Sequence, residues 1–261
     1  MIASAIPTGN LVCDLDGVVY RGDTVIAGAG EALSMLDEAG YTIVFATNNS
    51  SKVDSEVARK ITATSGYRAS VAQIVTSART AATLLGSEPN RVYVVGGEGL
   101  RVAVKEAGHE LVSRGADATA VVVGFDFNLS YDRIKEATLA LLKGARFIAS
   151  NLDTTFPASN GDLWPGAGSI VAALEAASGR QAEPAGKPFA PMRSLIEAKL
   201  RKGPTYAVGD RPETDLELGK SAGWSTVLVL SGVTDPKAAA DLEADIVIPS
   251  LADLPAALNV S

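Results

Sequence analysis

The sequence has very few of the residues that build disulfides, metal clusters and basic binding surfaces. Its 261 residues include one cysteine, Cys13, and one histidine, His109. A single cysteine excludes an intrachain disulfide and any site that needs several cysteines, and one histidine provides no histidine cluster. Lys and Arg number 23 against 30 Asp and Glu, which gives a net charge of −7. We therefore expect no nucleic-acid partner, because binding a phosphate backbone depends on clustered basic residues.

Long hydrophobic runs are also missing. No stretch approaches the roughly 18 consecutive apolar residues that a membrane-spanning helix needs. The first ten residues have neither the basic region nor the apolar segment of a signal peptide, so we expect a cytoplasmic protein without membrane association. The composition, with 47% hydrophobic and 20% charged residues, is that of an ordinary globular protein.

Apolar runs of strand length alternate along the chain with segments of helical periodicity. Because most of the runs lack polar alternation, they indicate strands covered on both faces, and the alternation predicts an α/β fold with a largely parallel sheet. The predicted strands are Leu11–Leu15, Tyr41–Ala46, Arg91–Val95, Ala118–Phe125, Ala145–Ala149, Thr205–Val208, Thr226–Leu230 and Asp245–Ile248. The predicted helices are Gly30–Ala39, Lys52–Thr64, Tyr131–Leu142, Ser169–Ala177, Pro191–Leu200 and Asp215–Ala222.

Carboxylates follow two of the predicted strands. Asp14 and Asp16 end the first strand, and Asp210 and Asp215 follow the strand near residue 205. In parallel sheets, binding sites form beyond the carboxyl ends of the strands, so these side chains could converge. Clustered carboxylates repel one another and need a cation, and Mg²⁺ prefers such hard oxygen ligands. One aspartate could attack phosphorus, while a second protonates the leaving oxygen and then deprotonates water.

Phosphate-binding groups are present as well. Thr47 and Asn48 follow another strand and offer a hydroxyl and amide donors near the start of a helix, where an anion is stabilised. Lys187 offers a positive charge for the phosphoryl oxygens, and phosphoryl transfer depends mainly on such positioning and electrostatic help. Each of these motifs alone is common in turns, caps and surface loops. Their joint occurrence after strands indicates a phosphoryl-transfer site.

Four segments resemble the motifs of haloacid dehalogenase superfamily phosphatases: Val12–Val18, Ala46–Asn49, Gly186–Pro188 and Gly209–Asp215. Three others, Tyr20–Gly22, Asn151–Asp153 and Pro165–Gly168, resemble the NagD-like, para-nitrophenyl phosphatase branch. The branch more often has Thr-Asn-Pro-Asp at residues 150–153. This sequence differs there at two positions, Ser150 and Leu152.

The resemblance implies a role for each matched residue. Asp14 would be the nucleophile and Asp16 the general acid and base. Thr47, Asn48 and Lys187 would bind the phosphate. Mg²⁺ would be held by Asp14, the backbone carbonyl of Asp16, and Asp210, with Asp215 in support, and a substrate loop would contain Asn151 and Asp153.

The resemblance also implies the domain organisation and the partners. A discontinuous Rossmann-like core would span residues 1–80 and 183–261, and an inserted α/β cap would span 81–182. The partners would be a small phosphorylated metabolite and a second copy of the chain that binds through the cap. Two alternatives stay open: a phosphomutase with the same nucleophile, and a non-catalytic protein that binds phosphorylated metabolites.

Overall fold

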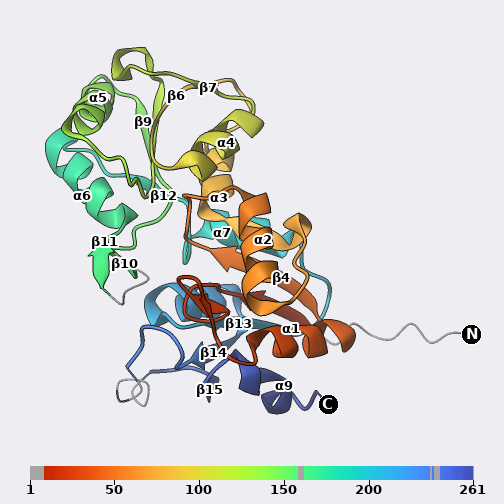
Figure 1. Ribbon diagram of the computed structural model, residues 1–261. Coiled ribbons are helices and arrows are strands. Elements are labelled where there is room, and N and C mark those ends of the chain that lie inside the picture. Colours follow the sequence, from red (N-terminus) through yellow and green to blue (C-terminus); the bar gives the residue numbers. More distant parts are fainter. Residues whose placement is uncertain (1–8, 158–161, 236, 238–241, 261) are drawn as a thin grey trace, which may run out of the picture. The chain divides into compact units, whose positions relative to one another are not determined.

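The computed structural model describes residues 9–157, 162–235, 237 and 242–260 (Figure 1). Residues 1–8, most of the segment compared with a signal peptide, lie outside the described residues. Contacts divide the chain into two compact units. Unit 1 comprises residues 1–46, 57–74 and 193–261, and unit 2 comprises 47–56 and 75–192. The division into a core of 1–80 plus 183–261 and a cap of 81–182 stays a prediction. Within the described part, no helix has the length and apolar character needed to cross a membrane.

The larger sheet has six strands in the order β15-β14-β13-β1-β4-β5, and its residues belong to unit 1 except residue 47 of β4 and residues 75–76 of β5. Its pairs β1–β13, β1–β4, β13–β14 and β14–β15 are all parallel. The strands are β1 (Asn10–Cys13), β4 (Thr42–Thr47), β5 (Ile74–Thr76), β13 (Thr205–Gly209), β14 (Ser225–Val229) and β15 (Ile246–Ile248). A separate antiparallel hairpin joins β2 (Tyr20–Arg21) to β3 (Thr24–Val25).

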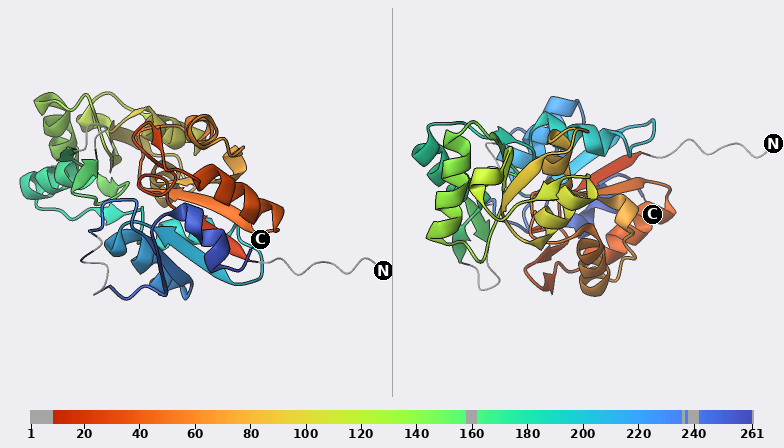
Figure 2. Two further views of the ribbon diagram at one scale, coloured as in Figure 1. Left: turned by 60° about the horizontal axis from the view of Figure 1, so that its bottom comes forward. Right: turned by 90° about the horizontal axis from the view of Figure 1, so that it is seen from above.

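One face of this sheet carries the apolar core of unit 1. Alternate strand residues such as Leu11, Cys13 and Phe45 are fully buried there, together with Leu33 of α1 and Ile61 of α2. Cys13, the single cysteine of the sequence, therefore packs in this core. Helices α1 and α9 come from opposite ends of the chain and pack against each other (Figure 2). The helices are α1 (Ala29–Glu38), α2 (Asp54–Ser65), α7 (Ala190–Glu197), α8 (Glu217–Ala222) and α9 (Leu254–Ala257).

Unit 2 contains a second parallel sheet, in the order β12-β9-β8-β6-β7. A small antiparallel hairpin pairs β10 with β11. The strands are β6 (Arg91–Val95), β7 (Glu110–Leu111), β8 (Ala120–Val123), β9 (Arg146–Ala149), β10 (Thr155–Pro157), β11 (Leu163–Pro165) and β12 (Glu183–Pro184). The helices are α3 (Ser77–Leu84), α4 (Glu98–Glu106), α5 (Tyr131–Leu142) and α6 (Ala167–Ser178).

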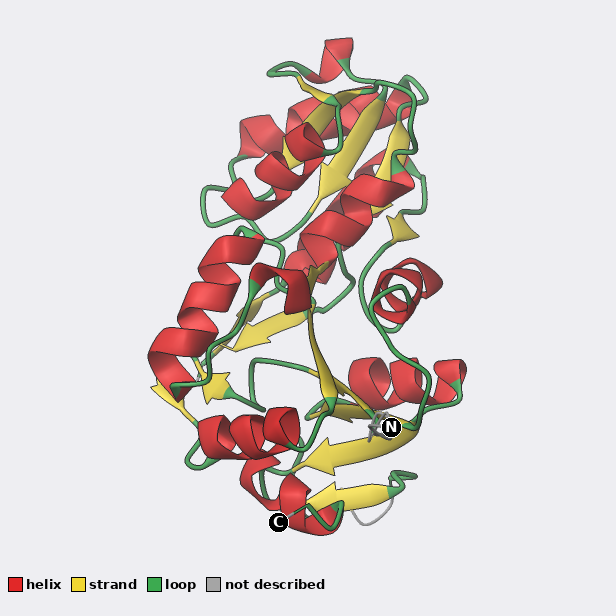
Figure 3. Ribbon diagram, turned by 90° about the vertical axis from the view of Figure 1, so that its right-hand side faces the viewer, coloured by secondary structure: helices red, strands yellow, loops and turns green. Residues whose placement is uncertain are grey.

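Helices cover both faces of this second sheet (Figure 3). Strand residues of one parity, such as Val95 and Val123, pack with α5 and α6, and residues of the other parity, such as Val94 and Val122, pack with α3 and α4. This arrangement explains the unbroken apolar strands, because a strand covered on both sides has no solvent face to carry polar residues. The predicted α/β fold with parallel sheets is confirmed.

Candidate active site

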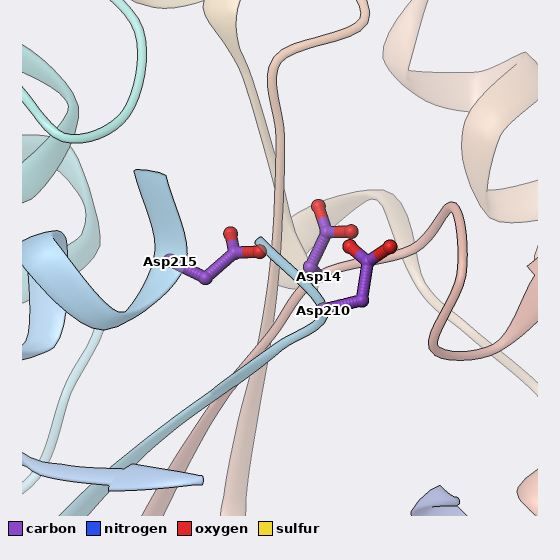
Figure 4. A group of neighbouring side chains, drawn as sticks. All are labelled: Asp14, Asp210 and Asp215. Atoms are coloured by element: carbon purple, nitrogen blue, oxygen red, sulfur yellow. The ribbon is translucent and has the colours of Figure 1, made fainter. Parts of the chain in front are cut away.

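Three aspartates of unit 1 bring their carboxylates together (Figure 4). Asp14 follows β1 and Asp210 follows β13, and the register pairs Cys13 with Val208, so both strands end at the same edge of the sheet. Asp215 comes from a helical turn over Pro212–Leu216. One carboxylate oxygen from each residue lies within 4.8 Å of the other two. The convergence expected for the carboxyl ends of neighbouring parallel strands is therefore present in unit 1.

The electrostatics of the cluster favour a bound cation. Asp210 and Asp215 are buried, with exposed fractions of 1% and 4%, whereas Asp14 is partly exposed. Two ionised carboxylates 4.8 Å apart repel by on the order of 3 kcal/mol at an effective dielectric constant near 20. The donor set contains carboxylate oxygens alone, which are the ligands that Mg²⁺ prefers. These residues therefore fit a magnesium ion.

Asp16 lies in the turn after β1. The strand ends at Cys13, so Asp14 and Asp16 are placed by this turn and not by the strand predicted over Leu11–Leu15. Gly17 has a φ of 89°, a conformation that suits glycine, and the amides of residues 18–20 all donate to the Leu15 carbonyl. This compact turn fixes the backbone that carries both aspartates.

Tyr20 is a buried residue near these acids that the sequence reasoning did not assign to the site. Burial is the main cause that raises the pKa of Tyr20 far above its ordinary value, and the charges of Asp16 and Asp14 raise it further. The phenol therefore keeps its proton at any physiological pH.

A loop after β14 holds Asp210. The amide of Val233 donates to Asp210 Oδ2 at 2.7 Å, and the Thr234 hydroxyl donates to the Asp210 carbonyl. These contacts were missed from the sequence. The segment Ser231–Thr234 directly follows the predicted strand Thr226–Leu230. Binding sites form beyond the carboxyl ends of parallel strands, so its position could have indicated this segment as it indicated Asp14 and Asp210.

In unit 2, Asn48 is the centre of a second polar cluster. Its side-chain oxygen accepts a hydrogen bond from the amide of Lys187 at 2.8 Å. Its side-chain nitrogen lies 3.2 Å from the Lys187 carbonyl and 3.1 and 3.2 Å from the two oxygens of Asp153. One amide side chain therefore joins the segment after β4 to the Gly186–Pro188 segment and to the predicted substrate loop.

Other contacts fix the same cluster. Asn151 Nδ2 donates to the Asn48 carbonyl at 2.7 Å, and the Oδ1 atom of Asn151 accepts from the Asp153 amide at 3.1 Å. The Thr47 hydroxyl accepts from the amide of Asn49 at 3.1 Å. The helix that follows, α2, begins only at Asp54, so Thr47 ends β4 and Asn48 lies in the loop between β4 and α2.

Lys187 is buried, with an exposed fraction of 4%. It is therefore not a solvated lysine of a surface loop. Gly186 explains how the backbone reaches the cluster, because a Cβ there would lie 2.5 Å from Asn48 Oδ1 and 2.7 Å from the Ser150 carbonyl. Burial of an ammonium group is costly unless polar or charged groups surround it.

The predicted site residues thus form two groups. Asp14, Asp210 and Asp215 are brought together in unit 1, with Asp16 in the adjoining turn. The second group lies in unit 2 and consists of Thr47, Asn48, Asn151, Asp153 and Lys187.

Comparison with known proteins identifies the family. Residues 11–110 match the haloacid dehalogenase-like hydrolases, and residues 184–254 match a family described as HAD-hydrolase-like. Mouse (Mus musculus) chronophin is 37% identical over an alignment of 264 residues, gaps included. The alignment covers 92% of this chain and 90% of that protein. The chain belongs to the haloacid dehalogenase-like hydrolases.

Two solved structures support the same assignment. A glycerol phosphate phosphatase from Mycobacterium tuberculosis, in complex with magnesium, is 35% identical with a TM-score of 0.85, covering 95% of this chain and 76% of that one. A 4-nitrophenylphosphatase from Thermotoga maritima is 35% identical with a TM-score of 0.86, covering 97% of each chain. This member of the family is a phosphatase, and its aspartate cluster fits the magnesium ion of such enzymes.

Proposed function

We propose that the protein hydrolyses small phosphate monoesters in a magnesium-dependent reaction that passes through an aspartyl phosphate on Asp14. The observation that supports this most is the convergence of Asp14, Asp210 and Asp215 in a chain of this hydrolase family. All three acids of the cluster are buried, and Asp14 is the one whose residue as a whole keeps partial exposure. This difference suits Asp14 to meet a substrate and the other two to hold the ion.

The chemistry has two steps. A carboxylate oxygen of Asp14 attacks phosphorus, the ester P–O bond breaks, and Asp16 gives its proton to the leaving alcohol oxygen. Asp16 then removes a proton from water, the water oxygen attacks phosphorus, and the bond to Asp14 breaks to release inorganic phosphate. Bound Mg²⁺, held by Asp14, the Asp16 carbonyl and Asp210, would supply positive charge that lowers the repulsion between the nucleophile and the phosphate. In this proposal Asp215 orients the ligands.

The phosphoryl oxygens would be bound by Thr47, the amide of Asn48 and Lys187. The Asn48 bonds to the backbone of Lys187 support this assignment, because they hold the lysine and the loop before α2 in one fixed arrangement. Asn151 and Asp153 would contact the leaving group. The candidate substrates are glycerol, glycolate, sugar and nucleotide monophosphates.

Phosphate release from para-nitrophenyl phosphate and from glycerol phosphate tests the proposal. The wild-type protein should release phosphate with Mg²⁺ and lose this activity in EDTA, and Asp14→Asn should be inactive with Mg²⁺. A phosphomutase would convert a sugar phosphate to its isomer faster than it releases phosphate. No release by the wild type, or equal release by Asp14→Asn, would exclude the proposed reaction.

The assembly and the compartment are part of the same proposal. We expect a homodimer formed through residues 81–182 and a cytoplasmic location. Light scattering of the purified full chain tests the dimer, since a monomeric mass at micromolar concentration contradicts it. Fractionation of the source cells tests the location.

A further inference from the structure

Arg21 contacts the loop that holds Asp210, although it lies outside the carboxylate cluster. Its Nε atom donates to the Ser231 carbonyl at 2.7 Å, and its Nη2 atom donates to the Gly232 carbonyl at 2.8 Å. One guanidinium group therefore binds two successive carbonyls. The planar fork of donors in arginine suits this geometry, and a lysine ammonium does not reproduce it.

The next residues of the loop bind Asp210. The Val233 amide donates to Asp210 Oδ2 at 2.7 Å, and the Thr234 hydroxyl donates to the Asp210 carbonyl. In the other direction, the Ser231 hydroxyl donates to the carbonyl of Gly17 at 2.7 Å. The loop Ser231–Thr234 thus connects Asp210 to the turn that follows the proposed nucleophile.

Close packing makes this connection stiff. A Cβ at Gly232 would collide with the Asp210 side chain, and a Cβ at Gly17 would collide with Asp210 and lie 2.9 Å from the Gly232 Cα. The Asp210 side chain is thus packed closely against the backbone of Gly17 and Gly232. A shift of the loop would move both the Val233 amide, which donates to the Asp210 carboxylate, and the Gly232 backbone, which packs against it.

We propose that Arg21 is a positioning residue for the metal site. By holding the Ser231 and Gly232 carbonyls, it fixes the Val233 amide and so the orientation of Asp210. The inference rests on the proposed function in one respect, which is that Asp210 binds the metal ion. An exposed arginine without such contacts would have little effect on the orientation of a buried carboxylate.

Calorimetric titration with Mn²⁺, a divalent ion that shares the preference of Mg²⁺ for oxygen ligands, tests this inference without substrate. Arg21→Ala should bind Mn²⁺ about tenfold more weakly than wild type, the lower end of the effect of removing a group that orients a metal ligand. Arg21→Lys should lie between the two. Arg59→Ala is the matched control, because Arg59 is an exposed arginine of unit 1 on α2. The Arg59→Ala variant should bind Mn²⁺ with wild-type affinity. Equal affinities of Arg21→Ala and wild type would overturn the proposal.

Far-UV circular dichroism and thermal unfolding without metal show whether each variant folds. If Arg21→Ala does not fold, Arg21→Lys and Ser231→Ala carry the test, since Ser231→Ala frees the same loop from the Gly17 carbonyl. Both should bind Mn²⁺ more weakly than Arg59→Ala, and wild-type affinity in both would overturn the inference.

Activity gives a second readout. In Arg21→Ala the Mg²⁺ concentration for half-maximal rate should rise by a larger factor than kcat falls. A purely structural role would lower kcat through loss of folded enzyme and leave that concentration unchanged, which would overturn the inference. A wild-type protein that binds Mn²⁺ but hydrolyses no phosphate monoester would contradict the proposed function alone, and the order of Mn²⁺ affinities would still test Arg21.

Discussion

Replacing Asn48 with alanine removes the side chain that joins three segments of unit 2. It deletes two hydrogen bonds to the Lys187 backbone and the contact with the Asp153 carboxylate. Neutral hydrogen bonds contribute about 1 kcal/mol each, a bond to a charged group about 1.5–3 kcal/mol, and a buried amide left without its acceptor costs about 1–3 kcal/mol. Because Asp153 is partly exposed, we take the low end and expect a loss of about 4 kcal/mol in the free energy of unfolding.

A double-mutant cycle isolates the Asn48–Asp153 contact. Asp153→Ala, Asn48→Ala and the double variant should give a coupling free energy of about 1.5 kcal/mol. The control cycle pairs Asn48→Ala with Asp117→Ala, because Asp117 is an exposed aspartate of unit 2, and its coupling should be near zero.

Urea unfolding followed by tryptophan fluorescence measures these values. The chain has two tryptophans, of which Trp164 lies in unit 2 and Trp224 in unit 1, so a Trp224→Phe background makes the signal specific to unit 2. A coupling below about 0.5 kcal/mol, with unchanged m values, would refute the assignment of Asn48 as the centre of the cluster.

Three other predictions follow from unit 1. Gly232→Ala places a methyl group where the Asp210 carboxylate lies, so the Mg²⁺ concentration for half-maximal activity should rise about tenfold; a wild-type value would contradict the packing. Asp16→Asn should slow hydrolysis of an alkyl phosphate by about 10²–10⁴-fold and of para-nitrophenyl phosphate by less, because nitrophenolate leaves without a proton; equal losses would contradict its role as the acid. The pKa of Asp245 is lowered by hydrogen bonds from the amide and hydroxyl of Thr226, so it stabilises the fold above about pH 4 and that stabilisation is lost as the pH falls through the lowered pKa. Asp245→Asn should therefore flatten the fall in Tm below pH 4, and an unchanged pH profile would refute this reasoning.

The parallel strands were predicted well from the sequence because each is a short, continuous apolar run. All eight predicted strands are present, with ends that differ by a few residues. Two of the elements that were missed have weak patterns. Helix α3 (Ser77–Leu84) consists largely of alanine, serine and threonine, and β5 (Ile74–Thr76) has only three residues. Their structure depends on packing against neighbours that are distant in sequence.

The candidate site was predictable where a polar residue follows a strand. The positions of Asp14 and Asp210 after strands predicted them. Arg21 instead contacts the backbone carbonyls of residues 231 and 232, and the side-chain types at these two positions do not indicate such a contact. The burial of Lys187 was likewise hidden, because it depends on the close approach that Gly186 allows.

His109 shows the same limit. It follows α4, yet it is buried, and its Nδ1 accepts a hydrogen bond from the Asn90 amide at 3.3 Å. The turn at Gly108, with a φ of 89°, brings it inside. A sequence pattern shows where a helix ends, whereas the direction of the chain after the turn is set by tertiary contacts.

The most direct test of the proposed mechanism is to trap the covalent intermediate. Full-length enzyme is mixed with Mg²⁺ and a phosphate monoester, quenched during turnover with borohydride, and digested for mass spectrometry. Borohydride reduces an acyl phosphate to an alcohol and leaves a free carboxylate intact, so the peptide containing residue 14 should carry homoserine at that position only when substrate is present. Homoserine at another aspartate, or no reduction in an enzyme that is turning over, would contradict Asp14 as the nucleophile.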